Sequence, residues 1–493
     1  MTKRAILAID QGTTGTTALL LDTEGKTLGK HGVEFPQHFP KPGWVEHDAE
    51  QIWESVAAAV KGALAHAGID AAAIAAIGIT NQRETTVVWE KKSGKPVHRA
   101  VVWQCRRTAD VIEKLRAEGL TETVQQHTGL VLDAYFSGTK IAWVLDHVEG
   151  ARARADRGEL AFGTIDSFLV HRLSGGTKHV TDYTNASRTL LLHLSKLEWD
   201  PEMLRLFRVP ESMLPTLVGN AETIAETRGL SFLPDGIPIC GMAGDQQAAL
   251  FGQGCLEEGD AKCTYGTGAF ALVNLGATPR LSTHGLVTTV AWKIADRAVY
   301  ALEGSAFVAG AVVQWLRDGL GIIQSATEIE ALAASVESSE GVMLVPALAG
   351  LGAPYWDQDA RGLITGITRG TTKAHLARAA LEGIAFEVND LLEAGEARLA
   401  RLRVDGGAAA NDLLMQFQAD ISRTTVERPV ELESTGRGAA LLAGLGAGLM
   451  DLGKVHSLGT VERSFEPKMP DVARTKALRS WREAVGRARS HAR

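Results

Sequence analysis

The chain has 493 residues, which is more than one ordinary hydrophobic core organises and predicts two domains or one large duplicated unit. Hydrophobic residues make up 45% of it and charged residues 22%, the balance of a soluble globular protein. The formal net charge of −7 argues against nucleic acid or an anionic membrane as a partner. A bound polyphosphate would therefore need positive charge that is concentrated locally.

The cysteines favour a reducing compartment, and the hydropathy of the chain argues against a membrane span. The four cysteines form no CxxC pair and have no histidine spacing typical of zinc, so we expect free thiols. The N-terminus shows no signal-peptide pattern. The most membrane-like stretch, residues 438–450, is too short to span a bilayer, and its GxxxG spacing favours a buried helix close to a neighbour. These features predict a cytoplasmic protein with no stable membrane insertion.

The chain opens with a predicted β-hairpin. Residues 5–9 are a short apolar run that ends in Asp-Gln-Gly, and residues 17–21 are a second apolar run. The loop between them is rich in glycine and threonine, whose backbone N–H groups and hydroxyls can surround an anion, while Asp10 can hold Mg²⁺ through water. The alternative is an ordinary hairpin turn in which the aspartate bonds the nearby backbone.

A helix is predicted next, over residues 48–67. Apolar residues recur in it every four positions, which gives one buried face. Asp48 with Gln51 resembles a capping box at its start, and Gly68 can end it.

A buried strand predicted at residues 74–80 leads into a polar segment. Arg83 and Glu84, adjacent in that segment, supply both the donors and the acceptors that vicinal hydroxyls require. The alternative for this pair is a surface salt bridge. Trp103 follows the next strand, and together with Tyr135 and Phe270 it can form an apolar wall around a carbon chain, although aromatic side chains more often pack in the core.

The second half repeats this theme. Its matching segments are apolar runs at 261–265 and 269–275 around a Gly-Thr-Gly turn, and an apolar run at 397–404 that ends in Asp-Gly-Gly before a helix at 411–417. No Pro-rich linker separates the halves. We therefore predict a short hinge near residues 241–252 and two domains, at residues 1–245 and 246–493.

One Gly/Thr-rich turn in each half suits two domains that clamp one polyphosphate between them. No GxxxxGK[ST] motif is present, which excludes a Walker-type site. The glycines at 405–407 can accept a flat nucleoside, or they can form a simple strand-to-helix turn with Asn411 near the helix cap. Asp245 lies beside carboxamides and can act as a general base for a hydroxyl, or it can cap the helix that follows.

Taken in order, these motifs resemble the FGGY family of carbohydrate kinases, and within it the branch that phosphorylates glycerol. The matching segments are residues 10–14, 42–48, 80–86, 103–107, 244–247 and 405–407, with the two family signatures at 135–147 and 362–382. The resemblance implies an α/β fold of two actin-like, RNase-H-like domains with ATP in the interdomain cleft. It implies ATP- and Mg²⁺-dependent phosphorylation of glycerol to sn-glycerol 3-phosphate, the entry step of glycerol catabolism. We also expect a homo-oligomer, a dimer or a tetramer.

The resemblance further implies a role for individual residues. Glycerol would contact Arg83, Glu84, Trp103, Tyr135, Asp245, Gln246 and Phe270, with Asp245 as the catalytic base. The nucleotide would contact Thr13, Thr14, Gly15, Thr267, Gly310, Gln314, Gly407 and Asn411. Asp10 and Asp245 would lie beside the metal.

The first loop departs from the family pattern. Relatives often continue it with Ser-Ser-Arg, where the arginine reaches the phosphates, but this chain has Gly15, Thr16 and Thr17. We therefore expect no phosphate-binding arginine there, while Thr16 can still donate a hydrogen bond. Two alternatives stay open: a family kinase for another small polyol or ketose (dihydroxyacetone, erythritol or xylulose), and an actin-like ATPase without a polyol substrate.

Overall fold

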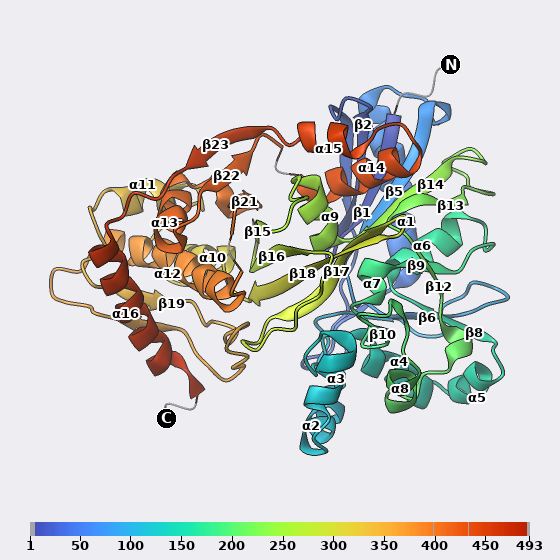
Figure 1. Cartoon of the computed structure of the whole chain (residues 1–493), viewed down its shortest axis with the longest axis horizontal. Helices are drawn as coiled ribbons and strands as arrows, with labels where there is room; N and C mark the ends of the chain where they lie inside the picture. The colour runs from blue at the N-terminus through green and yellow to red at the C-terminus, as the bar shows by residue number, and fades with distance from the viewer. Residues whose placement is uncertain (1–4, 398, 432, 491–493) are drawn as a thin grey trace.

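The computed structural model describes residues 5–397, 399–431 and 433–490, arranged in two lobes (Figure 1). The first lobe is built on a six-stranded sheet. In spatial order its strands are β13 (Ala221–Glu226), β14 (Pro238–Gly244), β5 (Ile74–Asn81), β1 (Ala5–Gln11), β2 (Gly15–Asp22) and β3 (Thr27–Glu34). The second lobe is built on a seven-stranded sheet. Its order is β17 (Val287–Ile294), β18 (Arg297–Ala306), β16 (Ala269–Gly276), β15 (Asp260–Tyr265), β21 (Arg401–Asp405), β22 (Val426–Pro429) and β23 (Val461–Phe465).

The two sheets share one topology. The central strand of each is antiparallel to the strand that follows it and parallel to a strand on its other side: β1 between β2 and β5, and β15 between β16 and β21. A further antiparallel strand, β3 or β18, extends one side, and a further parallel strand, β14 or β22, extends the other. The repeat predicted from the sequence is therefore confirmed, as is the α/β class.

Helices and short strand pairs surround the sheets. Besides α9 (Asp245–Gly252) and α14 (Ser434–Gly446), the helices are α1 (Ala49–Ala67), α2 (Ala109–Ala117), α3 (Thr121–Thr128), α4 (Ser137–His147), α5 (Ala151–Asp156), α6 (Ile165–Leu173), α7 (Tyr183–Ala186), α8 (Pro201–Leu206), α10 (Gly310–Asp318), α11 (Glu328–Ala334), α12 (Lys373–Ala394), α13 (Asp412–Ser422), α15 (Leu452–Ser457) and α16 (Asp471–Ala488). The short pairs are β4 (Glu46–His47) with β7 (Ala100–Val101), β6 (Val87–Glu90) with β8 (Leu160–Gly163), β9 (Val180–Asp182) with β12 (Thr216–Val218), β10 (Leu192–His193) with β11 (Glu198–Trp199), and β19 (Met343–Val345) with β20 (Leu363–Thr365).

Two helices connect the lobes. α14 (Ser434–Gly446) comes late in the chain, yet it packs on β1, β5 and β14 of the first sheet, where Figure 1 shows it beside the blue strands. Its Ala439 and Ala443 share a buried cluster with Ile6 and Leu19. α9 (Asp245–Gly252) follows β14 and packs against α14, while its Phe251 meets residues of the second sheet such as Trp292 at 5.5 Å between ring centroids.

Glycines make this helix crossing close. A Cβ atom at Gly438 of α14 would lie 1.8 Å from the backbone oxygen of Ala248, and one at Gly252 of α9 would lie 2.2 Å from that of Ser434. Neither position can hold a larger residue without moving a backbone. The closely packed, buried helix predicted at 438–450 is thus confirmed, with its end at Gly446.

The predicted helix at 48–67 is confirmed as α1, with one error at its start. Asp48 caps it by accepting from the N–H of Glu50, and Gly68 ends it in the left-handed region at φ 64°. The expected capping box is wrong, because the Gln51 side chain instead bonds His38 at 3.3 Å. That contact ties α1 to His38, which forms a β-bridge with Glu46 just before the helix.

One further prediction needs adjustment. The strand predicted at 397–404 begins only at Arg401, which pairs with Asp260 at the start of β15; residue 398 lies outside the described residues. The hinge near residues 241–252 stays a prediction, and β14 runs directly into α9 there. All four cysteines are free and buried, as expected. None of the described helices is both long and apolar enough to cross a membrane.

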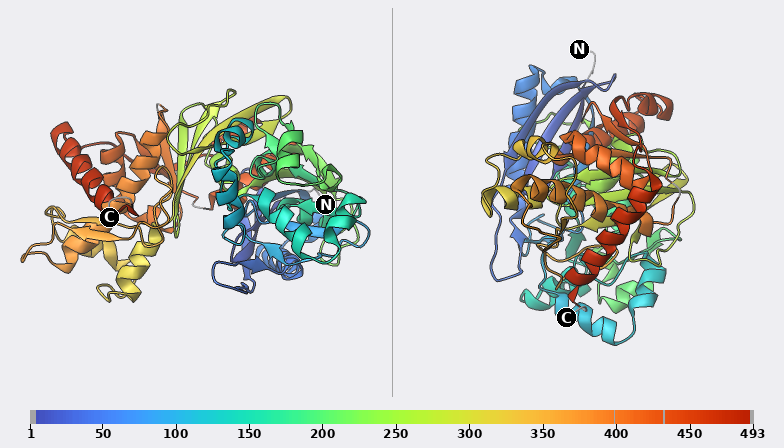
Figure 2. Two further views of the ribbon diagram at one scale, coloured as in Figure 1. Left: turned by 90° about the horizontal axis from the view of Figure 1, so that it is seen from below. Right: turned by 90° about the vertical axis from the view of Figure 1, so that its left-hand side faces the viewer.

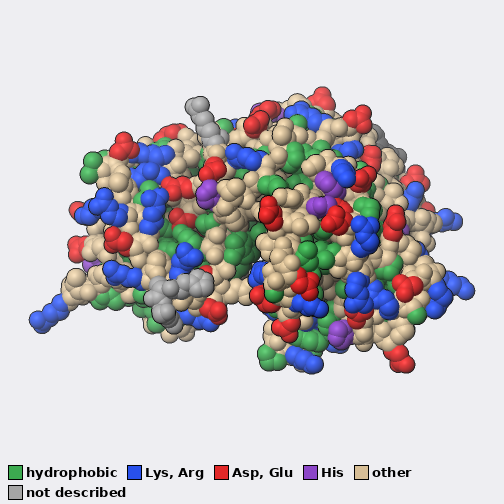
Figure 3. Space-filling model, turned by 60° about the horizontal axis from the view of Figure 1, so that its bottom comes forward, with side chains coloured by type: hydrophobic (Ala, Val, Ile, Leu, Met, Phe, Trp, Pro, Cys, Tyr) green, Lys and Arg blue, Asp and Glu red, His purple; other side chains and the backbone are tan. Residues whose placement is uncertain are grey.

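Figures 2 and 3 show how the lobes stand relative to one another. The yellow-green strands of the second sheet lie between the helices of the two lobes in the view from below (Figure 2). The space-filling view shows the surface hollowed between the lobes (Figure 3).

Candidate active site

The central strands of both sheets direct their C-terminal ends toward this junction. β1, β5 and β14 of the first sheet end at or next to Asp10, Arg83 and Asp245. β15 and β21 of the second sheet end at the Gly-Thr-Gly turn and at Asp405. In open α/β sheets, ligands bind at the carboxyl ends of parallel strands. The contacts below show that side chains from the two sheets meet here.

Arg83 joins the two lobes. Its side chain is buried, and its Nη1 and Nη2 atoms donate to Glu303 of β18, at 2.5 and 2.8 Å. Its Nε atom lies 3.0 Å from Oδ1 of Asp245. A surface salt bridge between Arg83 and Glu84 is therefore excluded, because Arg83 is held inside the molecule by carboxylates from both sheets.

Glu84 belongs to the same network. Its Oε1 atom accepts from Nε of Arg188 at 2.6 Å, and Nη2 of Arg188 reaches Glu303 at 3.1 Å. The backbone of Glu84 is left-handed, at φ 59°. This conformation is unfavourable for any residue other than glycine, and it is often retained at functional sites. Two arginines and two glutamates, all buried, thus form one compact cluster.

The charges in this cluster shift one another's pKa values. Burial opposes ionisation of Glu303, but the charges of Arg188 and Arg83 outweigh it and lower its pKa to about 2. For Glu84 burial outweighs the same two arginines and raises the pKa. Glu303 is therefore the ionised anchor of the two arginines, while the carboxyl group of Glu84 can form a hydrogen bond with a hydroxyl.

An aromatic wall lies against this cluster. Trp103 and Tyr135 meet edge to face at 5.5 Å between ring centroids. The Trp103 Nε1 atom donates to Oγ1 of Thr13 at 2.9 Å, which links the wall to the first loop. Buried Lys140 donates to the backbone oxygens of Tyr135 and of Glu84 and so holds these segments together. Phe270, the third aromatic residue expected here, is half-buried on β16 of the second sheet.

Asp245 is the first residue of α9 and is only partly buried. Its Oδ1 atom accepts from the N–H of Gln246 at 2.7 Å, besides the contact with Arg83. The cap position itself is occupied by Gly244, so a capping role does not account for the carboxylate. The Gln246 side chain accepts from Lys262, a buried lysine of β15 that also donates to Thr264 at 2.9 Å. Gln246 is thus tied to the second sheet.

Carboxylates also face one another at the end of β1. Burial raises the pKa of Asp10 to about 7, and the charges of Asp245 and Glu433 add to this shift. Two carboxylates that repel one another at a partly buried strand end are a donor set that a hard divalent cation would satisfy. Asp10 and Asp245 are the members of this set that the sequence also predicted.

The first loop is shaped by its own strand pair. Thr14 is exposed at its tip. A Cβ atom at Gly15 would lie 2.8 Å from the backbone oxygen of Val33, so β3 requires glycine there. Thr16 is buried, and its hydroxyl lies 2.7 Å from that of Ser55 in α1. The expectation that Thr16 donates toward a phosphate is therefore wrong, because alternation along β2 turns it toward the core.

The second loop is braced by α10. The backbone oxygens of Gly266 and Thr267 accept from the N–H groups of Gly310 and Ala311, at 2.8 and 3.1 Å. Thr267 and Gly310 are thereby held together, and Gln314 lies exposed one turn further along the helix.

The third loop follows β21. Gly407 is exposed at the start of a 3₁₀ turn (η3, Gly407–Ala410). The Asn411 side chain accepts from the N–H of Leu414 at 2.9 Å and caps α13. The capping interpretation is correct for Asn411, which leaves its amide nitrogen as the group that can face a ligand.

Three site residues were missed from the sequence: Arg188, Lys262 and Glu303. Lys262 and Glu303 are single charges within apolar strand runs, and both are buried. A charged residue within an apolar strand is rarely buried without a partner. The position of these two charges in the sequence could therefore have predicted a buried ionic contact. Arg188 follows α7 in a polar segment, where a charged residue is not unusual and the sequence pattern does not distinguish it.

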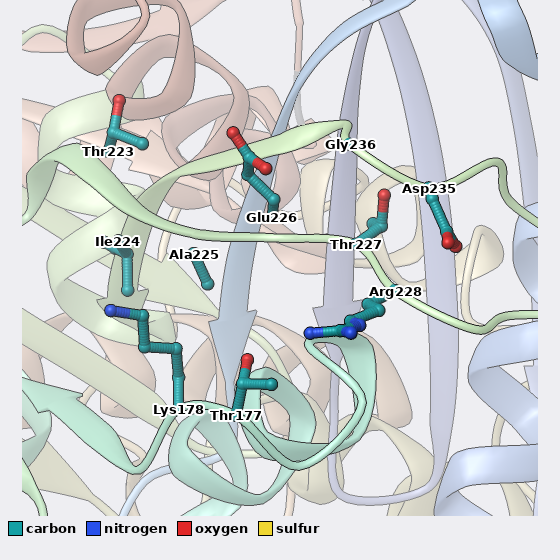
Figure 4. Close-up of a pocket in the computed structure, with 10 residues that line it drawn as sticks. All are labelled: Thr177, Lys178, Thr223, Ile224, Ala225, Glu226, Thr227, Arg228, Asp235 and Gly236. Atoms are coloured by element: carbon teal, nitrogen blue, oxygen red, sulfur yellow. The ribbon is translucent and has the colours of Figure 1, made fainter.

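An open pocket lies elsewhere in the first lobe. It measures about 640 Å³ and is open to solvent. Figure 4 shows Lys178 and Arg228 on its two sides, with Glu226 and Asp235 close by. Its mixed charges and openness define no particular ligand, and the predicted site residues are not part of its lining.

Comparison with known proteins defines the class. A model of the N-terminal domain of the FGGY family of carbohydrate kinases matches residues 5–252, and a model of the C-terminal domain of that family matches residues 261–447. The chain therefore belongs to the FGGY family of carbohydrate kinases. Its two lobes form the actin-like, RNase-H-like pair that the sequence predicted.

Individual relatives narrow the class further. A glycerol kinase from Carboxydothermus hydrogenoformans is 55% identical over 494 residues, covering 99% of each chain. One from Deinococcus radiodurans is 56% identical, covering 98% of this chain and 97% of its own. The crystal structure of Plasmodium falciparum glycerol kinase with ADP is 37% identical and matches with a TM-score of 0.93, covering 99% and 98%. A xylulose kinase from Lactobacillus acidophilus, at 22% identity and a TM-score of 0.87, shares the fold.

Proposed function

We propose that this chain is an ATP-dependent glycerol kinase that forms sn-glycerol 3-phosphate. The observation that carries the proposal is the cluster of Arg83, Glu84 and Asp245 beside Trp103, at the ends of the central strands of two sheets. Identity above 50% to glycerol kinases over nearly the whole chain supports the same activity.

Glycerol binding requires donors and acceptors in alternation. Arg83 donates and Glu84 accepts, and the Trp103–Tyr135 wall packs against the three-carbon chain. Glu303 fixes the plane of the Arg83 guanidinium through two hydrogen bonds, so that this group is oriented before the substrate arrives. We include Gln246 and Phe270 among the groups that line this pocket from the second lobe's side.

Asp245 is the proposed general base. It takes the proton of a terminal hydroxyl, and the resulting oxygen attacks the γ-phosphoryl group of ATP in line. The Nε atom of Arg83 and the N–H of Gln246 hold Oδ1 of Asp245, which fixes the carboxylate for this transfer.

The nucleotide is proposed to lie between the loops of the two sheets. Backbone and hydroxyl donors of the first and second loops would bind the phosphates, and the third loop would hold the nucleoside. The residues proposed to contact it are Thr13, Thr14, Gly15, Thr267, Gly310, Gln314, Gly407 and Asn411. Closure of the lobes would exclude the water that competes with glycerol.

The donor set at Asp10 and Asp245 fits Mg²⁺, a hard cation that prefers oxygen ligands. When bound there, Mg²⁺ would neutralise charge on the transferred phosphoryl group. Asp10 then has one role, to hold the cation through its carboxylate, while Asp245 shares its carboxylate between cation and substrate.

A coupled ADP-release assay tests the proposal across glycerol, dihydroxyacetone, erythritol and xylulose. We expect the highest kcat/KM with glycerol, because Arg83, Glu84 and the Trp103–Tyr135 wall suit a three-carbon polyol. The Asp245→Asn variant, run in parallel, reports any contaminating ATPase. A higher kcat/KM with another polyol or ketose would overturn the assignment of glycerol, and equally fast ADP release without any polyol would overturn the kinase itself.

The proposal also includes a cellular location, a domain boundary and an oligomeric state. A cytoplasmic location is supported by four buried, free thiols. A division at residue 245 is supported by the junction of β14 and α9 there. A homo-oligomer, a dimer or a tetramer, is checked by light scattering coupled to size exclusion, and a monomer across micromolar concentrations would refute it.

A further inference from the structure

A second cluster of ligand-type side chains lies outside the active site described above. His127 at the end of α3, His193 of β10 and Asp200 just before α8 bring ligand atoms within 4.8 Å of one another. Nδ1 of His127 lies 2.6 Å from Oδ2 of Asp200, and its Nε2 lies 3.7 Å from Oε2 of Glu202. Ligand atoms of His127, His193 and Asp200 thus lie around one point, with Glu202 beside the other ring nitrogen of His127.

The backbone holds the segments that carry these groups. The N–H of Leu194 donates to the backbone oxygen of His127 at 2.8 Å, which fixes β10 against the end of α3. Asp200 is fixed twice: its N–H donates to Leu191 at 2.7 Å, and its Oδ1 atom caps α8 through the N–H of Glu202. Oδ2 is therefore the atom left to face His127.

We infer that His127, His193 and Asp200 bind one divalent transition-metal ion of the Zn²⁺ type, with Glu202 or water as the fourth ligand. Mixed nitrogen and oxygen donors suit Zn²⁺, whereas Mg²⁺ prefers oxygen alone. Tetrahedral ligands about 2.1 Å from zinc are about 3.4 Å apart. The His127–Asp200 pair, at 2.6 Å, therefore has to open, and any separation near the 4.8 Å limit has to shorten. Both histidines are only partly buried, which leaves them room to turn.

The ion would brace a segment of the first lobe that contacts the second sheet. Leu192 and Leu194 of the β10 segment share a buried cluster with Val290 and Tyr300 of the second sheet. The Tyr300 hydroxyl donates to the backbone oxygen of Leu194 at 3.3 Å. The ion would join β10 to α3 and α8. It would thereby hold in place the β10 segment, whose leucines contact the second sheet.

Titration of the tag-free, full-length protein with Co²⁺ and Zn²⁺ tests the inference. We expect one Co²⁺ equivalent with the intense visible absorption of a tetrahedral site, and a rise of Tm with Zn²⁺. His193→Gln and His127→Gln should bind at least about tenfold more weakly and lose the absorption. His147→Gln, which changes a histidine stacked on Trp143, is the matched control and should behave like the wild type.

The comparison also separates this site from the carboxylates of the active site. Cations bound there persist in all variants, so only the signal lost with His193 and His127 is assigned to the cluster. Unchanged kinase turnover and unchanged Tm without metal show that the variants are folded. Identical titrations of the wild type and His193→Gln, or only weak octahedral absorption, would overturn the inference.

Discussion

The two sheets have the same topology but place different chemistry at their strand ends. In the first sheet, Asp10 of β1 is paired with Thr80 of β5. In the second sheet, the same positions hold Thr264 of β15 and Asp405 of β21. Each central pair thus presents one aspartate and one threonine, but the aspartate has changed strands.

The surroundings differ even more. Beyond β5 and β14 the first sheet presents buried arginine and glutamate side chains and a partly buried aspartate, whereas the second sheet presents glycine-rich turns that offer backbone N–H groups. Side-chain charges in fixed positions suit a small polyol, and backbone donors suit phosphates and a nucleoside. The fold decides where strand ends meet, and the residues at each end decide which substrate that lobe takes.

The sharpest test of this division is Asp245→Asn. If the first sheet supplies the proton acceptor, kcat should fall by about 10²–10⁴, the usual worth of a positioned base, with little change in the KM for ATP. Steady-state kinetics measure both. Asp48→Asn makes the same chemical change at a helix cap, where asparagine caps as well as aspartate, and should leave kcat unaltered. Near-normal turnover in Asp245→Asn would remove it from the role of base.

Glu303 is the residue of the second sheet that supports the first, and Glu303→Gln should break that link. Removing one partner of a buried ionic cluster costs about 3–5 kcal/mol of unfolding free energy, and the KM for glycerol should rise as Arg83 loses its alignment. Urea unfolding and kinetics measure these effects. Glu387→Gln is the matched control, because burial raises the pKa of Glu387 to about 8 and it is already mainly protonated at pH 7.

Glu303 and Glu387 should change the free energy of unfolding with pH in opposite directions. The pKa of Glu303, about 2, lies below its ordinary value of 4.5, so its stabilisation is present above pH 4.5 and is lost as pH falls toward 2. The pKa of Glu387 is raised above 4.5, so the wild type loses unfolding free energy as pH rises from 4.5 to about 8. Glu387→Gln should lack that loss. Parallel pH profiles for the two variants would contradict both assignments.

The helix crossing tests how far the lobes depend on each other. Gly438→Ala places a Cβ against the backbone of Ala248 and should lower the unfolding free energy by at least about 1–3 kcal/mol. Gly486→Ala in α16 meets no neighbouring atom within 4 Å and should instead be stabilising by about 0.5–1 kcal/mol. Chemical denaturation compares the two. Equal effects would mean that the crossing is looser than described.

The smallest expected effect concerns Thr17, which is paired with Asp10 across β1 and β2. Thr17→Arg adds a positive charge beside the proposed phosphate site and should lower the KM for ATP about two- to fivefold, the worth of one partly exposed ion pair. Thr17→Gln adds length without charge and should not. An unchanged KM in both would show that other groups, such as Lys30 near Asp10, already supply the charge.

Much of the fold was predictable because its signals are local. The hairpin of β1 and β2, α1 and the second hairpin all follow from apolar periodicity and glycine-rich turns. Position in these elements also placed Arg83, Glu84 and Asp245 at strand ends. The crossing of α9 and α14 was not predictable, because nothing in an apolar helix states which sheet it will cover.

The site was less predictable where it depends on the other lobe. Glu303 and Lys262 are recognisable only once β18 and β15 are known to face Arg83 and Gln246. Thr16 was misassigned because the phase of the β2 alternation decides which hydroxyl points outward, and a Gly/Thr run does not reveal that phase.

The late position of α14 in the chain bears on how the protein is made. The sheet face that carries Ile6 and Leu19 leaves the ribosome early, but its cover, α14, is among the last helices synthesised. At about 5–20 residues per second, that face stays bare for tens of seconds. The nascent first lobe therefore presents an apolar surface for most of translation, which makes it the natural point of engagement for a chaperone during synthesis.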